Sequence, residues 1–102
     1  MMTLQQIRQD LRDIRYYYSK KELFDSMIDV VLPNAIVDKI MRYNKAMERA
    51  PVRLLDIYIS LYLNNRTQVS LAEERNYSAE YIKQINLQLC QYLQKTFAEG
   101  SA

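Results

Sequence analysis

The chain has 102 residues, of which 49% are hydrophobic, and a formal net charge of +2. This apolar content excludes a disordered chain and suffices for one compact domain, whereas so mild a charge does not by itself indicate a nucleic-acid partner. With one Gly and two Pro the sequence has few residues that favour turns, so an all-α fold with short connections is predicted.

Histidine is absent and Cys90 is the sole cysteine, which excludes an internal disulfide and most zinc, Ser-His and Cys-His sites. We therefore expect no enzyme, no metal and no cofactor, with Cys90 a packed thiol. No apolar run reaches the roughly 18 residues that cross a bilayer, and the amino terminus lacks the apolar core of a signal peptide. A cytoplasmic location without membrane contact is predicted.

The first predicted helix begins at a capping box formed by Thr3 and Gln6. Its apolar seam is too short for a convincing coiled coil, so packing on the domain's own core is favoured over a dimer seam. The opposite face alternates Arg and Asp, which is typical of solvated charge. Three consecutive tyrosines, 16–18, cannot all face one core, so at least one is expected to be exposed, either as a contact surface or as an amphipathic edge. The seam consists of Leu4, Ile7, Leu11, Ile14 and Tyr18.

Two more helices are predicted before residue 50. One starts at a capping box of Ser19 and Glu22 and ends before Pro33, and the next runs over about 35–48. Ile36, Val37, Ile40, Met41 and Met47 are expected to point inward from the second of these. Its other face, continued past Pro51, is the most basic stretch of the chain, and we weigh it evenly as a solvated flank or a phosphate-contacting flank. This basic flank consists of Lys39, Arg42, Lys45, Arg49 and Arg53.

A scaffold helix over about 51–63 should follow, with Pro51 in its first turn and a broad apolar face that includes Val52. Two helices joined by a very tight turn come next, within 67–96. Asn76 tolerates positive φ and Ser78 is a good N-cap, so the chain should stop one helix and start another there. We expect Val69, Leu71 and Ala72 to face inward from the first helix, Tyr77 to fill the core from the turn, and Ile82, Ile85, Leu89 and Leu93 to face inward from the second.

A small residue midway along the first of these helices, here Ala72, lets the second cross closely, as a helix-turn-helix requires. The string Thr67-Gln68, Leu71-Ala72-Glu73-Glu74, Tyr77-Ser78, Glu80-Tyr81-Ile82 and Gln84-Ile85 resembles the helix-turn-helix of region four of bacterial sigma factors and, more broadly, small sigma-like regulators of bacteria, phages and mobile elements. The resemblance covers about 51–95. It departs from the family at the turn, where Asn76 replaces the usual Gly and Arg75 an apolar residue.

The predicted elements together indicate a compact bundle of about six helices in one domain, 1–102, with 1–50 supporting a helix-turn-helix unit over 51–97. The resemblance implies that the second motif helix enters the DNA major groove, where Gln84 would pair with adenine, Lys83 with guanine or a phosphate, and Glu80 with cytosine. Residues at the start of the first motif helix would lie near the backbone. The implied DNA-binding residues are Arg66, Thr67, Gln68, Ser78, Ala79, Glu80, Lys83 and Gln84.

The predicted function is therefore sequence-specific binding of double-stranded DNA by a transcription regulator. RNA polymerase is a further partner by analogy, through Glu73, Glu74 or the last helix. Dimerisation on a palindrome and binding together with polymerase both remain open as sources of affinity. The alternative is a helical protein–protein interaction module, a phage inhibitor or adaptor, that does not bind DNA.

Overall fold

The computed structural model describes residues 2–21 and 34–100, and these residues are helical without any strand. The elements are α1 (Leu4–Ser19), α3 (Asn34–Met47), α4 (Val52–Ile57), the π-helical segment η1 (Tyr58–Leu63), α5 (Gln68–Arg75) and α6 (Ala79–Ala98). The all-α prediction is confirmed for this part of the chain. The helix predicted between Ser19 and Pro33, one of the expected six, lies almost entirely outside the described residues.

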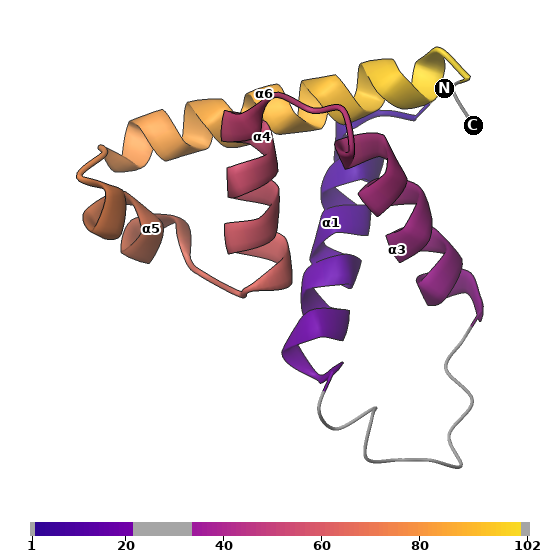
Figure 1. The fold of residues 1–102 in the computed structure, drawn as a ribbon, viewed down its shortest axis with the longest axis horizontal. Coiled ribbons are helices and arrows are strands. Elements are labelled where there is room, and N and C mark those ends of the chain that lie inside the picture. Colours follow the sequence, from indigo (N-terminus) through magenta and orange to yellow (C-terminus); the bar gives the residue numbers. More distant parts are fainter. Residues whose placement is uncertain (1, 22–33, 101–102) are drawn as a thin grey trace.

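The long helix α6 lies along one side of the molecule and contacts α1, α3, α4 and α5 (Figure 1). Beneath it, α1 lies between α3 and the continuous helix formed by α4 and η1, while α5 lies beyond η1, under the amino-terminal end of α6. Because α6 contacts elements from both halves of the chain, its two ends have different neighbours. The first half meets α5 and the second meets α1 and α3.

Local capping signals determine where the helices begin. The backbone N–H of Gln6 donates to Thr3 Oγ1 at 3.1 Å, and Gln6 Oε1 accepts from the Thr3 backbone N–H at 2.8 Å, which confirms the predicted capping box. Thr67 and Ser78 cap α5 and α6 in the same way, since each hydroxyl oxygen accepts a backbone N–H three residues on at 3.0 Å. These caps satisfy amides that a helix start would otherwise leave without a partner.

The seam of α1 packs on the domain's own core, where Ile7, Leu11 and Ile14 are fully buried. Two apolar residues expected in the core are instead exposed: Met41 on α3 and Val52 at the start of α4, with 64% and 81% of their surface accessible. The buried face of α3 follows a stripe that does not include Met41, and Val52 lies in the first turn of α4, before that helix reaches the core. The buried residues of α3 are Ile40, Tyr43 and Met47.

Tyr43 is a core residue that the apolar pattern did not predict. Its ring is fully buried and meets Phe97 of α6, with ring centroids 4.9 Å apart, while its hydroxyl donates to Asp10 at 2.7 Å. Tyrosine can occupy a core only if its hydroxyl finds a partner there. Asp10 on α1 is that partner, and burial together with this hydrogen bond raises the pKa of Tyr43.

The acidic residues of α1 are not simply solvated, contrary to the expectation from sequence. Lys39 of α3 lies 3.0 Å from a carboxylate oxygen of Asp10 and 3.0 Å from one of Asp13. This bridge connects α1 to α3 next to the Tyr43 hydroxyl group. The reason is tertiary: α3 lies antiparallel to α1 and brings a cation to a face that looks exposed in sequence.

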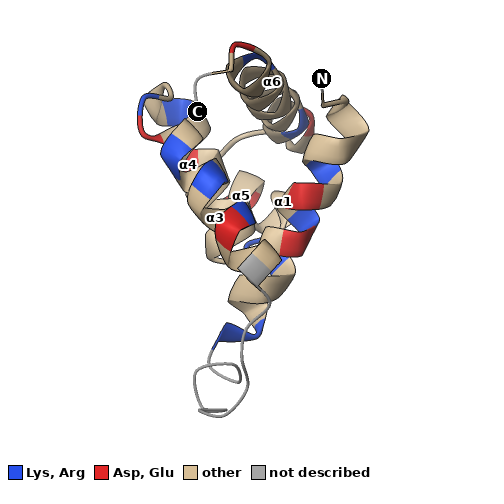
Figure 2. Ribbon diagram, turned by 90° about the vertical axis from the view of Figure 1, so that its right-hand side faces the viewer, with Lys and Arg blue, Asp and Glu red and all other residues tan. Residues whose placement is uncertain are grey.

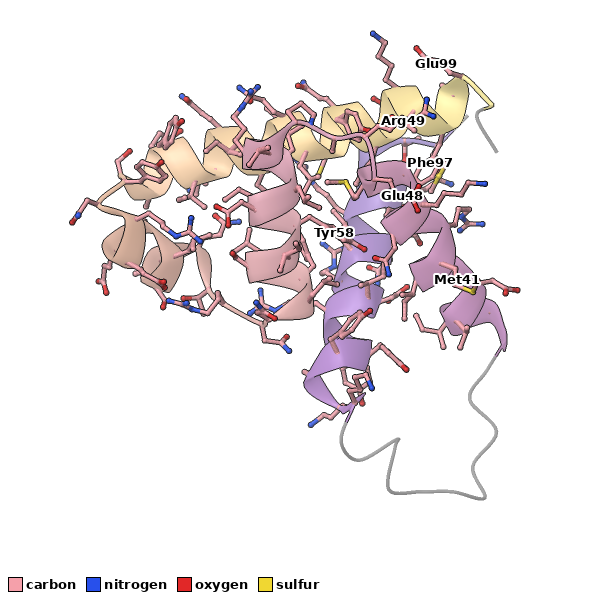
Figure 3. All side chains as sticks on the ribbon, viewed as in Figure 1. Met41, Glu48, Arg49, Tyr58, Phe97 and Glu99 are labelled. Atoms are coloured by element: carbon pink, nitrogen blue, oxygen red, sulfur yellow. The ribbon has the colours of Figure 1, made fainter. Side chains whose placement is uncertain are left out.

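The predicted scaffold helix over 51–63 is present as α4 and η1 without a break. In η1 the wider π turn buries Ser60, Leu61 and Tyr62 consecutively, and Tyr58 is also buried, between this helix and α1 (Figure 3). The segment ends as expected, because Asn65 adopts a φ of +58°. No helix in the described part of the chain combines the length and the apolar character needed to cross a membrane.

Candidate nucleic-acid interface

The turn between α5 and α6 has the geometry expected from its sequence. Asn76 adopts the left-handed conformation, with φ 57° and ψ 37°, and its neighbour Tyr77 donates its backbone N–H to the Ala72 carbonyl at 2.8 Å. The Asn76 N–H bonds the Glu73 carbonyl at 3.3 Å, so the last carbonyls of α5 are satisfied by a Schellman-type closure. Ser78, three residues after the end of α5, then caps the start of α6.

The two helices cross at a small residue. Ala72 is buried together with Leu71 on α5, and Ile82 and Ile85 are buried on the facing side of α6, as predicted. Leu89, Leu93 and Cys90 extend this buried side along α6. Ala72, the small residue expected midway along the first motif helix, is therefore buried, and α5 packs against α6.

Two side chains of this region that were predicted to face the core are exposed instead. Val69 is 61% exposed because Leu71 and Ala72 alone provide the buried side of the short helix α5. Tyr77 is 47% exposed, and its ring packs edge-on against Tyr81, which is also exposed, with centroids 4.8 Å apart. The turn directs Tyr77 outward because Leu71 and Ile82, both fully buried, already fill the space between the helices.

A shallow depression of about 380 Å³ brings together several of the predicted DNA-binding residues. Gln68 enters it from the start of α5, and Glu80, Lys83 and Gln84 enter it from the first turns of α6. These three α6 side chains are exposed and Gln68 is half-buried. The depression is lined by Arg8, Gln68, Glu80, Lys83, Gln84, Asn86 and Leu87. The start of α5 and the outer side of α6 thus form one polar surface.

Arg8 of α1 is the residue of this depression that the sequence did not indicate. It appeared to belong to the solvated face of the first helix, because it alternates with Asp10 and Arg12. It reaches the depression only because α1 packs against α6 and η1. No local signal could have found it, since at least 60 residues separate it in sequence from the other residues of the depression.

A hydrogen bond holds Asn86, one of the residues that line the depression. Asn86 of α6 accepts from the Tyr62 hydroxyl at 2.5 Å, and burial of this tyrosine raises its pKa to about 12. Cys90, one turn further along, is a buried free thiol, as predicted. Its burial raises the thiol pKa against the opposing effect of the Arg8 guanidinium. Both groups are therefore neutral near pH 7.

The other predicted DNA-binding residues lie around this depression with other contacts. Arg66 forms an ion pair with Glu74 and donates to Ser70 Oγ at 3.0 Å. The hydroxyl oxygens of Thr67 and Ser78 are occupied as helix caps, although each hydroxyl retains its hydrogen for donation. Ala79 is exposed in the first turn of α6.

Arg75, which replaces an apolar residue of the family pattern, extends toward α4 rather than into the core. Its two terminal nitrogens meet the two carboxylate oxygens of Asp56 at 2.6 and 2.9 Å. This fork-to-fork geometry fixes both side chains. The end of α5 is thereby attached to α4 by an ion pair.

The basic flank is not brought to the depression. Lys39 is held by Asp10 and Asp13, and Arg53 donates at 3.0 Å to Oε1 of Gln88, which does not line the depression. The remaining three cations, Arg42, Lys45 and Arg49, line a separate groove at the carboxyl-terminal end of α6. The even alternation of blue and red along α1 contrasts with this local excess of cations (Figure 2).

Within residues 2–21 and 34–100, no group of three His, Cys, Asp or Glu side chains is placed to hold a metal ion. No protein-family model matches the chain, and neither a curated protein nor a solved structure matches it. The function is therefore argued from the geometry of the depression and its residues.

Proposed function

We propose that the chain is a sequence-specific DNA-binding transcription regulator that inserts the first turns of α6 into the major groove. The observation that carries this proposal is the common surface of Glu80, Lys83 and Gln84 with Gln68 of α5. A recognition helix needs a row of exposed donors and acceptors near its amino-terminal end, next to a positioning helix. The sigma-like pattern of the same residues supports the proposal from sequence.

Each side chain has a defined role in this proposal. Gln84 would donate to and accept from an adenine edge, Lys83 would donate to guanine, and Glu80 would accept from a cytosine amino group. Gln68 on one flank and Arg8 on the other would contact phosphates and fix the register of α6. RNA polymerase or a second copy of the chain would act as a partner that adds affinity to this small interface.

The alternative, a protein–protein interaction module that does not bind DNA, also has a specific observation in its favour. Tyr77 and Tyr81 form an exposed aromatic pair at the turn, and exposed tyrosine is common at protein interfaces. The pairing of Arg66 with Glu74 and of Arg75 with Asp56 also reduces the positive field near α5. Salt separates the two functions, because phosphate contacts weaken steeply as salt rises and an apolar interface does not.

The test is selection of duplexes from a random-sequence library at two salt concentrations. We expect the wild-type chain to enrich a defined motif. The Lys83→Ala, Gln84→Ala double variant should lose its preference at two base pairs and bind at least tenfold more weakly, because each lost base contact costs about 1–3 kcal/mol. The matched control is Gln91→Ala, Lys95→Ala, which removes the same residue types from an exposed part of α6 beyond the depression.

Circular dichroism establishes that all three proteins are folded. A control variant that loses the motif as the double variant does would show that α6 contributes only general charge. Absence of any enriched motif at either salt concentration, with the wild type folded, would reject DNA recognition by this chain and leave the interaction module.

A further inference from the structure

A second surface lies at the other end of α6. A groove of about 970 Å³ separates the carboxyl-terminal part of α3 from the last turns of α6, and the amino-terminal residues of the chain close one end of it. Glu48 and Arg49, in the turn just after α3, line this groove together with Phe97 of α6 (Figure 3). The groove is lined by Met2, Gln6, Arg42, Lys45, Ala46, Glu48, Arg49, Tyr92, Thr96, Phe97 and Gly100.

The floor of this groove is apolar and held in place. Met2, Ala46, Tyr92 and Phe97 are partly buried and pack on the core. The Tyr92 hydroxyl donates to the Ala46 carbonyl at 2.8 Å, which connects α6 to α3 across the floor. The Phe97 ring packs against Tyr43. A preformed apolar floor of this kind favours a ligand with its own apolar side chains.

The rim of the groove is basic. Arg42, Lys45 and Arg49 are exposed; the first two lie three residues apart on α3, and Arg49 lies in the turn just after it. In the described part of the chain, the cations Lys39, Arg66 and Arg75 form ion pairs with carboxylates, whereas these three do not. Glu48 is the one acidic residue of the lining. The groove therefore has a net positive rim available to a ligand.

The groove is well separated from the proposed DNA-binding surface. Along α6, Gln84 and Thr96 are 12 residues apart, which corresponds to about 18 Å along the axis and about 120° around it. Leu87 and Tyr92, which line the two surfaces, differ by about 140° in direction. A duplex held against the first turns of α6 would leave the groove accessible.

We propose that this groove binds an acidic amphipathic segment of a partner protein. Carboxylates of the segment pair with Arg42, Lys45 and Arg49, and its apolar side chains pack against the floor at Tyr92 and Phe97. A nucleic-acid backbone would satisfy the three cations but would leave four apolar floor residues without a matching surface. The proposal does not depend on DNA binding by the other end of α6.

The test begins with a display library of random peptides of about 16 residues, four helical turns, selected on the full chain. Binders are counter-selected against the folded triple variant Arg42→Gln, Lys45→Gln, Arg49→Gln. Affinities of the enriched peptides are then measured by fluorescence anisotropy. The matched control, Arg12→Gln, Lys20→Gln, Lys95→Gln, makes the same change in net charge at exposed positions outside the groove.

We expect enriched peptides with several carboxylates and with Leu or Phe at helical spacing. Their affinity should fall about tenfold in the groove variant, the effect of roughly three exposed ion pairs, and less than about twofold in the control. Replacing the apolar residues of a peptide by Ser should abolish binding. Because that change is in the peptide, the fold of the protein is not at risk.

Four results would overturn the proposal. The first is that no selected peptide distinguishes the wild type from the groove variant, and the second is that the enriched peptides lack carboxylates. The third is an equal loss of peptide affinity in the groove and control variants. The fourth is undiminished binding of the Ser-substituted peptide. A tenfold loss of duplex DNA affinity in the groove variant, without peptide selection, would assign the rim to phosphate contacts instead.

Discussion

The two halves of α6 differ in how their neighbouring charges are arranged. Around the first half, the arginines of the α5 region are matched by carboxylates, Arg66 by Glu74 and Arg75 by Asp56. Around the second half, Arg42, Lys45 and Arg49 are not matched in this way. A net charge of +2 therefore does not locate the positive field, because ion pairing decides where it remains.

Because of this difference, the two halves of α6 are suited to different kinds of interaction. The first half presents mainly amides and one lysine, which can read base edges but attract DNA weakly over distance. The second half presents three cations over an apolar floor, which suits an acidic and partly apolar partner. The four predictions below test whether the halves are independent surfaces on one folded unit.

The largest expected effect tests whether both halves belong to one cooperative unit. Leu93→Ala, in the second half, should lower the free energy of unfolding by about 2–5 kcal/mol, because it leaves a cavity at a fully buried position. Ile82→Ala, in the first half, should shift the same single transition by a similar amount. Urea denaturation followed by circular dichroism and tyrosine fluorescence measures both, and two separate transitions would show that the halves unfold independently.

The next effect tests the contribution of α1 to the first surface. Arg8→Gln should weaken DNA binding by about tenfold for all sequences alike and reduce the slope of log affinity against log salt by about one, because it removes one phosphate contact. Arg12→Gln is the control, since Arg12 lies one turn further along α1 and donates to Gln9 at 2.8 Å. Equal behaviour of the two variants would remove α1 from the interface without affecting the proposed role of α6.

A smaller effect is expected at the turn. Asn76→Ala should lower the free energy of unfolding by about 1 kcal/mol, because alanine is strained at a φ of +57°, whereas Asn76→Gly should be neutral or slightly stabilising. The turn belongs to the first half alone. Asn76→Ala should therefore reduce DNA affinity while leaving peptide binding in the groove unchanged, and a parallel loss of both would contradict the independence of the two surfaces.

The smallest effect concerns the bridge between α1 and α3. Burial opposes the charged form of Asp13, but the hydrogen bonds from Lys39 and Gln9 outweigh it and lower the pKa of this carboxyl. In Lys39, hydrogen bonds to both aspartates likewise outweigh burial and raise the pKa. The carboxyl therefore stabilises the fold above its unfolded pKa of 3.8 and loses that contribution as the pH falls through its lower folded pKa.

Lys39→Met should thus lower the melting temperature only slightly at pH 7 and flatten its decline below about pH 4. The raised pKa of Lys39 adds stability that is present below 10.5 and is lost as the pH rises above it, so the variant should also flatten the alkaline limb. Thermal melts across the pH range measure both limbs. An unchanged acid limb in Lys39→Met would show that the bridge does not couple folding to this titration.

The sequence by itself predicted the features that depend on neighbours within about four residues. The capping box of Thr3 and Gln6, the stop before Ser78 and the left-handed Asn76 follow from backbone amides that need partners and from the sterics of positive φ, so they can be predicted from short strings. The buried stripes of α1 and α6 were also predicted, because a 3.6-residue period fixes one face of a helix.

Tertiary packing alone decided which helix faces are in contact and which of their side chains are buried, exposed or ion-paired. It exposed Tyr77, Val69, Met41 and Val52, buried Tyr43 by providing Asp10, and divided the basic flank between an ion-pair bridge and a separate groove. It also brought Arg8 to the α6 depression. The physical reason is that periodicity specifies an apolar face but not its partner, and long side chains pair with whatever the packing of distant helices places within about 4 Å.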